Sequence, residues 1–375
     1  MNNIAHISTV HIRTDTRIYY KEVQSLSKHY NVLMIVADGL GNSITDYCEI
    51  LDLGLPKNRT ARILFFGLKS IRLLKSKNID IVHIHDPELI IVGLLLKING
   101  YKVVYDIHEL VYKSIKDKSW ITFKGVRFII ALIYRYIEGI ALRFFDKIIL
   151  AEDGYKDFYD SEYPKRISKY TYIRNYPIIS MFSKNNKEII NSFSKENNII
   201  YLGAISEERG VFELIESMNY LDDSFKLYII GKWRSNLLLE KCQNSLGWNK
   251  VEMLGYIEPH KIGEYIKNSK LGMCTLHKID NYAYTTPVKS FEYLINGLPL
   301  IMTDFPFWQK FYKDVALFVD PKDPKKISEA IYNIINDPKK YDKLSKNSVN
   351  LALKHTWDSE EKKLFKLYSD LILEK

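Results

Sequence analysis

The segment Pro287-Val288-Lys289-Ser290-Phe291-Glu292-Tyr293-Leu294-Ile295-Asn296-Gly297-Leu298-Pro299-Leu300-Ile301 predicts a short helix, a tight turn and a buried strand. Pro287 suits the first turn of a helix, where its missing N–H group costs nothing, and Thr285 and Thr286 are candidate caps. Gly297 is a typical residue to end such a helix. The N-terminus of the helix presents unpaired N–H groups and the positive end of the helix dipole, so it suits a diphosphate.

Glu292 lies about one turn into this helix. A carboxylate there can accept hydrogen bonds from both hydroxyls of a ribose, which would make Glu292 a nucleotide-binding residue. The segment by itself equally allows an ordinary strand–helix–strand unit that carries a surface glutamate.

The same order of short apolar run, turn and amphipathic helix repeats along the chain. Runs of this length, rich in Ile and Val, are typical of strands buried on both faces of a parallel sheet. Helical segments such as 17–29 and 88–98 lie between them, which predicts an α/β fold with doubly wound sheets. The predicted strands are 4–8, 32–36, 79–84, 103–107, 147–150, 199–202, 226–230, 251–254, 271–275, 300–302 and 316–319.

The length of 375 residues and a break in this pattern predict two domains. The first comprises residues 1–180, and the second comprises residues 198–356. Between them, residues 181–197 form a polar linker rich in Lys, Asn and Ser. Residues 357–375 form an amphipathic helix, which we expect to cross back to the first domain.

Charge and composition limit the partners and the compartment. The net charge of +9 favours anionic partners, but a solubilising surface charge explains it equally well. The three cysteines lie far apart, without metal-ligand spacing, as expected in a reducing compartment. We find no signal peptide and no run of about 18 uncharged apolar residues. We therefore expect a cytoplasmic protein. The sequence contains no known nucleic-acid-binding motif, so we expect no nucleic acid partner.

Glu292 within Phe-Glu-Tyr, followed by Gly-Leu-Pro, resembles the signature of glycosyltransferase family 4. That signature has two glutamates eight positions apart, and the position of the first is occupied here by Tyr284. The resemblance implies a GT-B fold, with two Rossmann-like domains facing across a cleft, and retaining transfer from a nucleotide-sugar without metal or cofactor. It also implies that Glu292 holds the ribose. With Tyr284 in place of a glutamate, backbone groups of residues 284–288, from Tyr284 through Thr285, Thr286 and Pro287 to Val288, are left to contact the sugar.

The segment 201–210 resembles the strand and loop that open the second domain in this family. Gly203 ends the strand, and Ala204 stands where the family usually has an arginine. Arg209 keeps the second positive charge, which would stabilise the departing diphosphate, although Arg209 read alone equally suits a solvated loop. Lys289, or Lys232 or Arg234 after Gly231, is a candidate for the missing charge.

The segment 80–88 resembles the family strand that ends in His-x-His-Asp-Pro. His108 ends the next strand, and the resemblance implies that it faces the donor sugar. We expect His85 and Asp86 to line the site and His83 to be structural. Alternate residues of a strand share a face, so His83 and His85 make a metal site sterically feasible. The family needs no metal, and we predict none.

The loop after the first strand carries His11, Arg13, Asp15 and Arg17. We expect these residues at the cleft or the acceptor. Arg13 and Arg17 are placed to reach anions at the carboxyl end of the strand, and Asp15 could orient Arg17 or an acceptor hydroxyl. A helix N-cap formed by Asp15 or Thr16 is an equal alternative.

The stretch 113–147 mixes lysines and arginines with aromatic residues. This combination fits peripheral contact with an anionic membrane at the inner face of the cell membrane, where a lipid-linked acceptor would be delivered. A helix packed on the sheet is the equal alternative.

The resemblance and the charge together predict a hexosyl- or glycosyltransferase of class EC 2.4. The expected donor is a UDP-sugar, or else a GDP-sugar. The expected acceptor is a glycan or lipid-linked glycan in bacterial surface polysaccharide synthesis, such as capsule or O-antigen. The alternative is a catalytically silent, nucleotide-binding partner subunit, which the departures at Ala204 and Tyr284 motivate.

Overall fold

The computed structural model describes residues 1–117, 123–164, 169–179, 196–279 and 282–374. The chain divides into two compact units, one of Met1–Asn175 with Trp357–Lys375 and one of Tyr176–Thr356. The first unit thus ends earlier than the predicted boundary at residue 180. The predicted linker 181–197 lies almost entirely outside the described residues. The final helix, α15 (Trp357–Leu373), belongs to the first unit.

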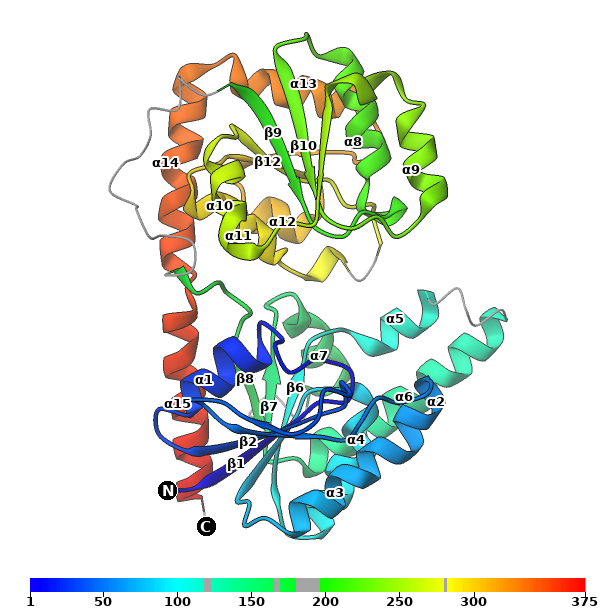
Figure 1. Ribbon diagram of the computed structural model, residues 1–375, viewed down its shortest axis with the longest axis vertical. Coiled ribbons are helices and arrows are strands. Elements are labelled where there is room, and N and C mark those ends of the chain that lie inside the picture. Colours follow the sequence, from blue (N-terminus) through cyan, green and yellow to red (C-terminus); the bar gives the residue numbers. More distant parts are fainter. Residues whose placement is uncertain (118–122, 165–168, 180–195, 280–281, 375) are drawn as a thin grey trace. The chain divides into compact units, whose positions relative to one another are not determined.

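The first unit is built on one sheet with the strand order β3-β4-β2-β1-β5-β6-β7-β8 (Figure 1). All neighbouring strands are parallel except β3, which runs antiparallel to β4. The strands are β1 (Asn3–Ile7), β2 (Asn31–Val36), β3 (Ser43–Ile44), β4 (Glu49–Asp52), β5 (Ile81–Ile84), β6 (Lys102–Ile107), β7 (Lys147–Leu150) and β8 (Tyr170–Tyr172). The predicted strands are confirmed to within two residues, whereas β3, β4 and β8 were not predicted.

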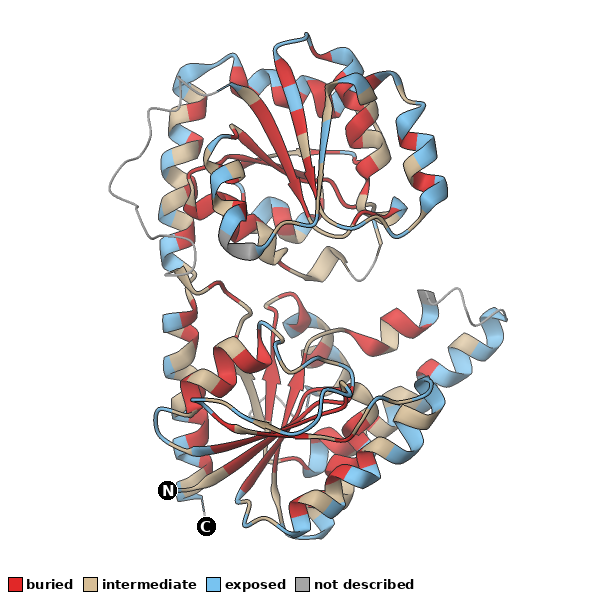
Figure 2. Cartoon of the chain, in the orientation of Figure 1, coloured by how far each residue is buried: buried red, intermediate tan, exposed pale blue. Residues whose placement is uncertain are grey.

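Helices cover both faces of this sheet, and the strands between them are buried (Figure 2). The helical segments are η1 (Ile18–Val23), α1 (Gln24–Leu26), α2 (Arg59–Ala61), η2 (Arg62–Phe66), α3 (Gly67–Lys75), η3 (Pro87–Leu89), α4 (Ile90–Ile98), α5 (Val111–Asp117), α6 (Lys124–Phe144), α7 (Tyr155–Glu162) and α15. Polar contacts hold helix α15 to the first unit, and two of them are buried. Trp357 Nε1 donates to Ser25 Oγ at 2.9 Å, and the Tyr368 hydroxyl lies 2.8 Å from His83 Nδ1.

The second unit has a fully parallel sheet with the strand order β11-β10-β9-β12-β13-β14. Its strands are β9 (Asn197–Leu202), β10 (Phe225–Ile230), β11 (Val251–Gly255), β12 (Leu271–Cys274), β13 (Leu300–Thr303) and β14 (Ala316–Val319). Its helices are η7 (Glu207–Arg209), α8 (Val211–Ser217), η8 (Met218–Tyr220), α9 (Asn236–Gln243), η9 (Leu246–Lys250), α10 (Pro259–Lys267), η10 (Tyr282–Tyr284), α11 (Val288–Ile295), α12 (Pro306–Phe311), α13 (Pro324–Ile335) and α14 (Pro338–Lys354).

Alternate residues of β9 enter two different cores. Ile199 and Tyr201 pack in one apolar cluster, and Ile200 and Leu202 pack in another. Successive side chains of a strand point to opposite faces, so a central strand between two helix layers must be apolar at every position. This is why β9 reads as a continuous apolar run in the sequence.

Helix α11 begins at Val288, with Pro287 as its N-cap residue and without a side-chain cap. The predicted caps at Thr285 and Thr286 are therefore wrong, because proline itself occupies the capping position. The end of the helix is as predicted: Gly297 has φ +73° and donates its N–H to the carbonyl of Leu294 at 2.9 Å. A residue with a side chain would be strained in this left-handed conformation.

A buried carboxyl group fixes the inner side of α6. Glu138 is 1% exposed, and its two oxygens accept hydrogen bonds from the hydroxyls of Tyr134, Tyr159 and Tyr163 at 3.2, 3.0 and 3.0 Å. Burial raises the pKa of Glu138 to about 7, and the three hydroxyl donors only partly oppose that rise. The folded chain therefore holds a proton that an unfolded chain releases near pH 4.5.

This proton makes stability depend on pH. The contribution of Glu138 is complete below the unfolded pKa of 4.5 and is lost as the pH rises to about 7. Glu138→Gln stays neutral, so between these two values it should lose about 3 kcal/mol less unfolding free energy than the parent. Urea unfolding across this range measures the difference, with Glu264→Gln on exposed α10 as control. Equal pH dependence in all three proteins would contradict the prediction.

Candidate active site

In both units several of the predicted site residues follow strands at a topological switch point. In the first sheet, β1 lies between β2 and β5, so the loops after β1 and β5 leave in opposite directions. In the second sheet the same holds for β9, which lies between β10 and β12. Ligands of open α/β sheets bind in the crevice at such points, beyond the carboxyl ends of the strands.

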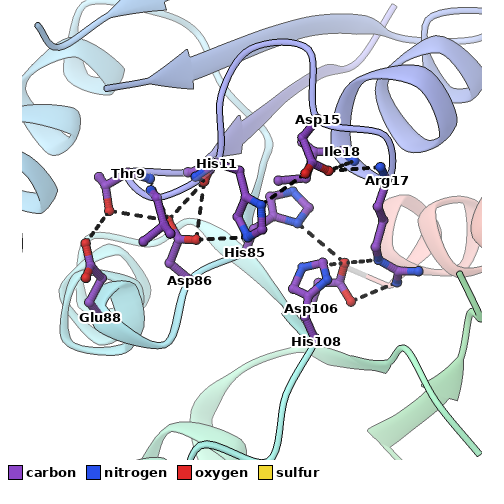
Figure 3. Close-up of polar contacts among 12 residues, drawn as sticks. Thr9, His11, Asp15, Arg17, Ile18, His85, Asp86, Glu88, Asp106 and His108 are labelled. Atoms are coloured by element: carbon purple, nitrogen blue, oxygen red, sulfur yellow. Dashed lines mark hydrogen bonds and ion pairs between the residues drawn. The ribbon is translucent and has the colours of Figure 1, made fainter. Parts of the chain in front are cut away.

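Asp86 organises the loop that follows β1 (Figure 3). Its Oδ2 accepts hydrogen bonds from the backbone amides of Thr9 and Val10 at 2.5 and 3.1 Å and from Ser8 Oγ at 3.0 Å. The carboxylate is 1% exposed, and these donors replace the water that it loses. Asp86 therefore shapes the loop that carries His11 and is itself part of the site.

Asp15 is not the N-cap of the helical segment η1 that the alternative interpretation expected, because η1 begins at Ile18 with Arg17 as its N-cap residue. Its Oδ1 accepts from the backbone amides of Arg17 and Ile18, each at 2.9 Å. Its Oδ2 lies 3.1 Å from His11 Nδ1. Although burial lowers the pKa of His11, the contacts with Asp15 and Asp86 reverse the effect and raise it. His11 is therefore protonated more readily than a free imidazole.

The prediction that Arg17 reaches an anionic ligand is wrong. The side chain is 3% exposed, and its Nε and Nη2 donate to the two oxygens of Asp106, each at 2.9 Å (Figure 3). Its Nε also lies 3.2 Å from Glu22 Oε1. Burial would raise the pKa of Asp106, but Arg17 and then His108 lower it well below its usual value. The pair is therefore ionised inside the protein.

The guanidinium group of Arg13 also donates its hydrogen bonds within the chain, contrary to the prediction that it reaches a bound anion. Its Nε and Nη2 donate to the two oxygens of Asp38 at 2.8 and 2.7 Å, and its Nη1 donates to Ser43 Oγ at 2.9 Å. These contacts tie the loop after β1 to the edge of the sheet. Arg13 and Arg17 thus hold the loop from its two sides.

His108 lies at the end of β6, with its Nε2 3.2 Å from Asp106 Oδ2. Burial lowers the pKa of His108 to about 3, although Asp106 acts in the opposite direction. The imidazole is therefore neutral near pH 7 and can donate or accept one hydrogen bond without carrying charge.

Four of the predicted residues, His11, His85, Asp86 and His108, line one cavity of about 620 Å³ in the first unit. Residues that the sequence analysis did not single out complete it: Val10, Arg59, Arg62, Ile63, Pro87, Glu88, Ile90, Ile91, Tyr105, Asp106, Glu109, Val111, Ile115, Tyr134 and Ile137. The cavity thus has polar groups from the strand ends and an apolar wall from α4, α5 and α6. Asp106 was detectable, because it precedes His108 by two residues and so points to the same side of the strand.

In the second unit, Gly203 and Gly231 let two strand ends approach closely. Gly203 has φ +142° and Gly231 has φ +154°. A Cβ atom on Gly231 would lie 1.8 Å from the carbonyl oxygen of Gly203, so only glycine fits. Arg209 lies beside this turn, because its Nη1 would be 3.6 Å from a Cβ atom on Gly203. Its guanidinium lies 5.9 Å from the ring centre of Tyr282.

Glu292 and Lys289 lie on the first turns of α11 and pair with each other. Lys289 Nζ donates to the two oxygens of Glu292 at 2.8 and 3.0 Å. Glu292 is 5% exposed, whereas the side chain of Lys289 is 41% exposed. Because they are three positions apart on a helix, the two residues face the same side.

The segment that leads into α11 is fixed by a hydrogen bond from Trp308 Nε1 to the carbonyl of Thr285 at 2.7 Å. Tyr284 ends η10, Thr286 is buried, and Pro287 and Val288 open the helix. Lys232 lies on a different strand end, with its Nζ 5.0 Å from the ring centre of Tyr256. Strands β9 and β12 are neighbours, so the turn at Gly203 and the segment after β12 leave the sheet side by side.

Both halves of the chain match models of glycosyltransferases. The model described as Glycosyltransferase Family 4 matches residues 16–175, and the model described as Glycosyl transferases group 1 matches residues 182–350. The chain belongs to glycosyltransferase family 4. The resemblance read from Glu292 and its neighbours is thereby confirmed.

Relatives and solved structures agree with this family 4 assignment. The O-antigen chain mannosyltransferase of Salmonella typhimurium is 23% identical over 250 residues, which are 64% of this chain and 67% of that protein. Sucrose-phosphate synthase of Thermosynechococcus elongatus superposes with a TM-score of 0.76 at 16% identity and covers 100% of both chains. Anabaena HepE in complex with UDP gives a TM-score of 0.73 at 12% identity, over 99% of this chain and 100% of that chain. The fold of this glycosyltransferase is GT-B.

Removal of the Arg17 side chain should lower the free energy of unfolding of the first unit. Arg17→Ala leaves Asp106 and Glu22 buried without a cation, which costs about 3–5 kcal/mol of unfolding free energy. Lys28→Ala is the control, because Lys28 pairs with Glu361 while 58% exposed and should cost about 1 kcal/mol or less. Urea unfolding near neutral pH compares the two variants. A similar loss of unfolding free energy in both variants would show that the buried ion pair contributes no more to stability than the exposed one.

Proposed function

We propose that this glycosyltransferase moves a hexose-type sugar from a nucleotide diphosphate sugar to a glycan or lipid-linked acceptor, with retention of configuration and without a metal ion in the reaction. UDP-sugar is the first choice of donor and GDP-sugar the second. The process we assign is bacterial surface polysaccharide synthesis, such as capsule or O-antigen. HepE, solved with UDP, and the O-antigen chain mannosyltransferase support the donor and the process.

One observation carries this proposal: a nearly buried carboxylate, Glu292, stands on the helix that follows the switch-point strand β12. Lys289 occupies its two oxygens in the free protein. A ribose would take over the carboxylate through its two hydroxyls and free the ammonium group for the diphosphate. Arg209 supplies the second cation, and Lys232 is a further candidate.

The reaction breaks the bond between the anomeric carbon and the diphosphate oxygen and forms a bond to an acceptor hydroxyl on the same face. The acceptor proton passes to an oxygen of the departing diphosphate, so atoms and charge balance. Cations placed before the reaction stabilise the charge that develops on that oxygen. His108, neutral near pH 7, faces the sugar as a hydrogen-bond partner rather than as a cation.

Glu292→Gln tests the ribose role. The amide accepts on one atom only, so the affinity for UDP should fall about 10- to 100-fold, as expected for hydrogen bonds to a charged group. Calorimetric titration of UDP and GDP measures both affinities and also selects the base. Glu264→Gln, on exposed α10, should bind as the parent does. Unchanged affinity in Glu292→Gln would remove the role that we assign.

Ala204 and Tyr284 motivate the alternative of a silent nucleotide-binding subunit. Each replaces a charged residue that the family usually has. A protein that binds a nucleotide with Glu292 but turns over neither UDP-sugars nor GDP-sugars, with or without acceptor, would support this alternative over catalysis. Release of nucleoside diphosphate from either donor would exclude it.

We also propose that α6 touches an anionic membrane at the inner face of the cell membrane, and that the protein is otherwise cytoplasmic. Exposed apolar residues lie along one side of this helix, namely Phe128, Ile129, Leu132, Ile133 and Tyr136, with exposed fractions of 51%, 57%, 40%, 55% and 73%. Arg127, Arg135 and Arg143 lie on the same helix. Such a surface supports interfacial binding. Residues 118–122 of the predicted stretch lie outside the described residues, and no described helix is long and apolar enough to span a bilayer.

The membrane contact can be tested with vesicles. The triple variant Phe128→Ser, Ile129→Ser, Ile133→Ser should lose about tenfold or more in partition to anionic vesicles, because three apolar side chains no longer enter the interface. Leu237→Ser, at a 78% exposed position on α9, is the control. Co-sedimentation with phosphatidylglycerol vesicles is the measurement, and equal partition of parent and triple variant would end this proposal.

A further inference from the structure

Three histidines and one glutamate meet in the core of the first unit, beneath the cavity. His6 comes from β1, His83 and His85 come from β5 and its end, and Glu22 comes from η1. All four side chains are at most 1% exposed. His6 and His83 are register partners on neighbouring strands, and His85 follows on the same side two residues later.

The four side chains converge closely enough to share one ion. Each offers one ligand atom, and these atoms all lie within 4.8 Å of one another. Glu22 Oε2 lies nearly equidistant from three imidazoles: 3.9 Å from His6 Nδ1, 3.8 Å from His83 Nδ1 and 3.9 Å from His85 Nε2. His6 Nδ1 and His85 Nε2 are 2.9 Å apart.

The carboxylate of Glu22 is an unusual feature of this core. Both of its oxygens are buried and have no hydrogen-bond partner. The neighbouring cation, Arg17, donates its hydrogen bonds to Asp106 instead. A buried carboxyl group without donors costs free energy, and such groups in native proteins are paired or bind metals. Glu22 therefore has an ion pair with Arg17, whose Nε lies 3.2 Å from Oε1, but no hydrogen-bond donor, and its Oε2 faces the three imidazoles.

The charges lead to the same conclusion. Among the described residues, the ion pairs of this group include one cation, Arg17, which faces two carboxylates, Asp106 and Glu22. The set is short of positive charge unless Glu22 holds a proton or a metal ion is bound. Three imidazoles and one carboxylate are the donors that zinc prefers, and four protein ligands are typical of a structural zinc site.

We propose that His6, Glu22, His83 and His85 bind one Zn²⁺ ion in the core of the first unit. Zinc bonds of about 2.0–2.2 Å in a tetrahedron place the ligand atoms about 3.3–3.5 Å apart. Four of the six distances, 2.9–3.9 Å, bracket this spacing, and the other two pairs lie within 4.8 Å, so shifts of up to about an ångström complete the site. The ion is structural, and the transfer reaction proposed above does not use it.

One of the three histidines, His85, has a second carboxylate beside its outer nitrogen. Asp106 Oδ2 lies 3.4 Å from His85 Nδ1, the nitrogen that does not face Glu22. Carboxylates commonly orient a metal-bound histidine in this way. The hydroxyl of Tyr368 on α15 lies 2.8 Å from His83 Nδ1, the nitrogen that faces Glu22, so the bond to the ion would replace this contact. The ion would thus connect β1, β5 and η1 to the residues that hold His108, since Asp106 also lies 3.2 Å from His108.

A second group, His85, Asp106 and His108, also lies within 4.8 Å, but it makes a weaker metal site. Both oxygens of Asp106 already accept hydrogen bonds from Arg17. This group offers three residues rather than four, and one of its carboxylate oxygens would have to leave a buried arginine. We therefore place the ion on Glu22.

Metal content decides the proposal. Tag-free parent protein, purified from a zinc-supplemented culture and dialysed, should contain about one zinc per chain by mass spectrometry of the elements. Protein refolded with Co²⁺ should show the intense visible absorption of a tetrahedral site, and Zn²⁺ should raise its thermal midpoint. Folded parent protein with less than about a tenth of an equivalent of zinc, and no shift with added Zn²⁺, would overturn the proposal.

The position of the ion is tested by two matched pairs of variants. Glu22→Gln with His83→Gln should lose the zinc and the cobalt absorption, because two of four ligands are gone. His277→Gln with Glu213→Gln removes a histidine–glutamate pair of 3.1 Å in the second unit and should keep both. Zinc retained by the first pair would refute the site. Should that pair fail to fold, the metal content and cobalt spectrum of the parent still decide.

Discussion

The ion pair between Arg17 and Asp106 is the contact on which the first unit depends. It joins the loop after β1 to the end of β6 across 89 positions of sequence and is almost fully buried. Asp106 is shared further, with His85 and His108, so one carboxylate sets the position of two imidazoles. Breaking a buried pair leaves an uncompensated charge, which explains why an arginine at the mouth of a strand can be structural rather than ligand-binding. The imidazoles that line the cavity are therefore positioned by the buried Asp106, which Arg17 holds in place.

The second unit relies on a steric constraint in place of a charge. The backbone of Gly231 approaches the carbonyl of Gly203 so closely that a methyl group would overlap with it. Gly210 is similarly restricted, because a Cβ atom there would lie 2.0 Å from the carbonyl of Thr275. These approaches bring strand ends and the start of α8 together around an open backbone surface. A diphosphate needs hydrogen-bond donors close to its oxygens, and glycines, which have no side chain, let backbone N–H groups come that close.

The alternation of apolar runs and helices predicted the strands of both sheets, because strands buried on two faces are apolar throughout. It missed β3, β4 and β8, which are two to four residues long and partly polar. The sequence predicted helix ends at glycines correctly, as at Gly297. It predicted the start of α11 wrongly, because Pro287 and neither of the two threonines is the N-cap residue. Among site residues, the motif positions Glu292 and Arg209 could be read locally. The role of Arg17 could not, since its partner Asp106 is distant in sequence and known only once the sheet is formed.

The distribution of charge separates the tasks of the two units. Around the cavity of the first unit, Asp86, Glu88, Asp106 and Glu109 face Arg59 and Arg62, and Arg62 is bound by Glu88 at 2.8 and 3.1 Å. From these charges we expect the cavity to disfavour a diphosphate and to suit neutral hydroxyl groups. In the second unit, Arg209, Lys232 and Lys289 stand near strand ends and a helix N-terminus, where negative charge is favoured. For the proposed transfer, the cations of the second unit therefore suit the diphosphate, whereas the carboxylates and the uncharged His108 of the first unit suit neutral hydroxyl groups.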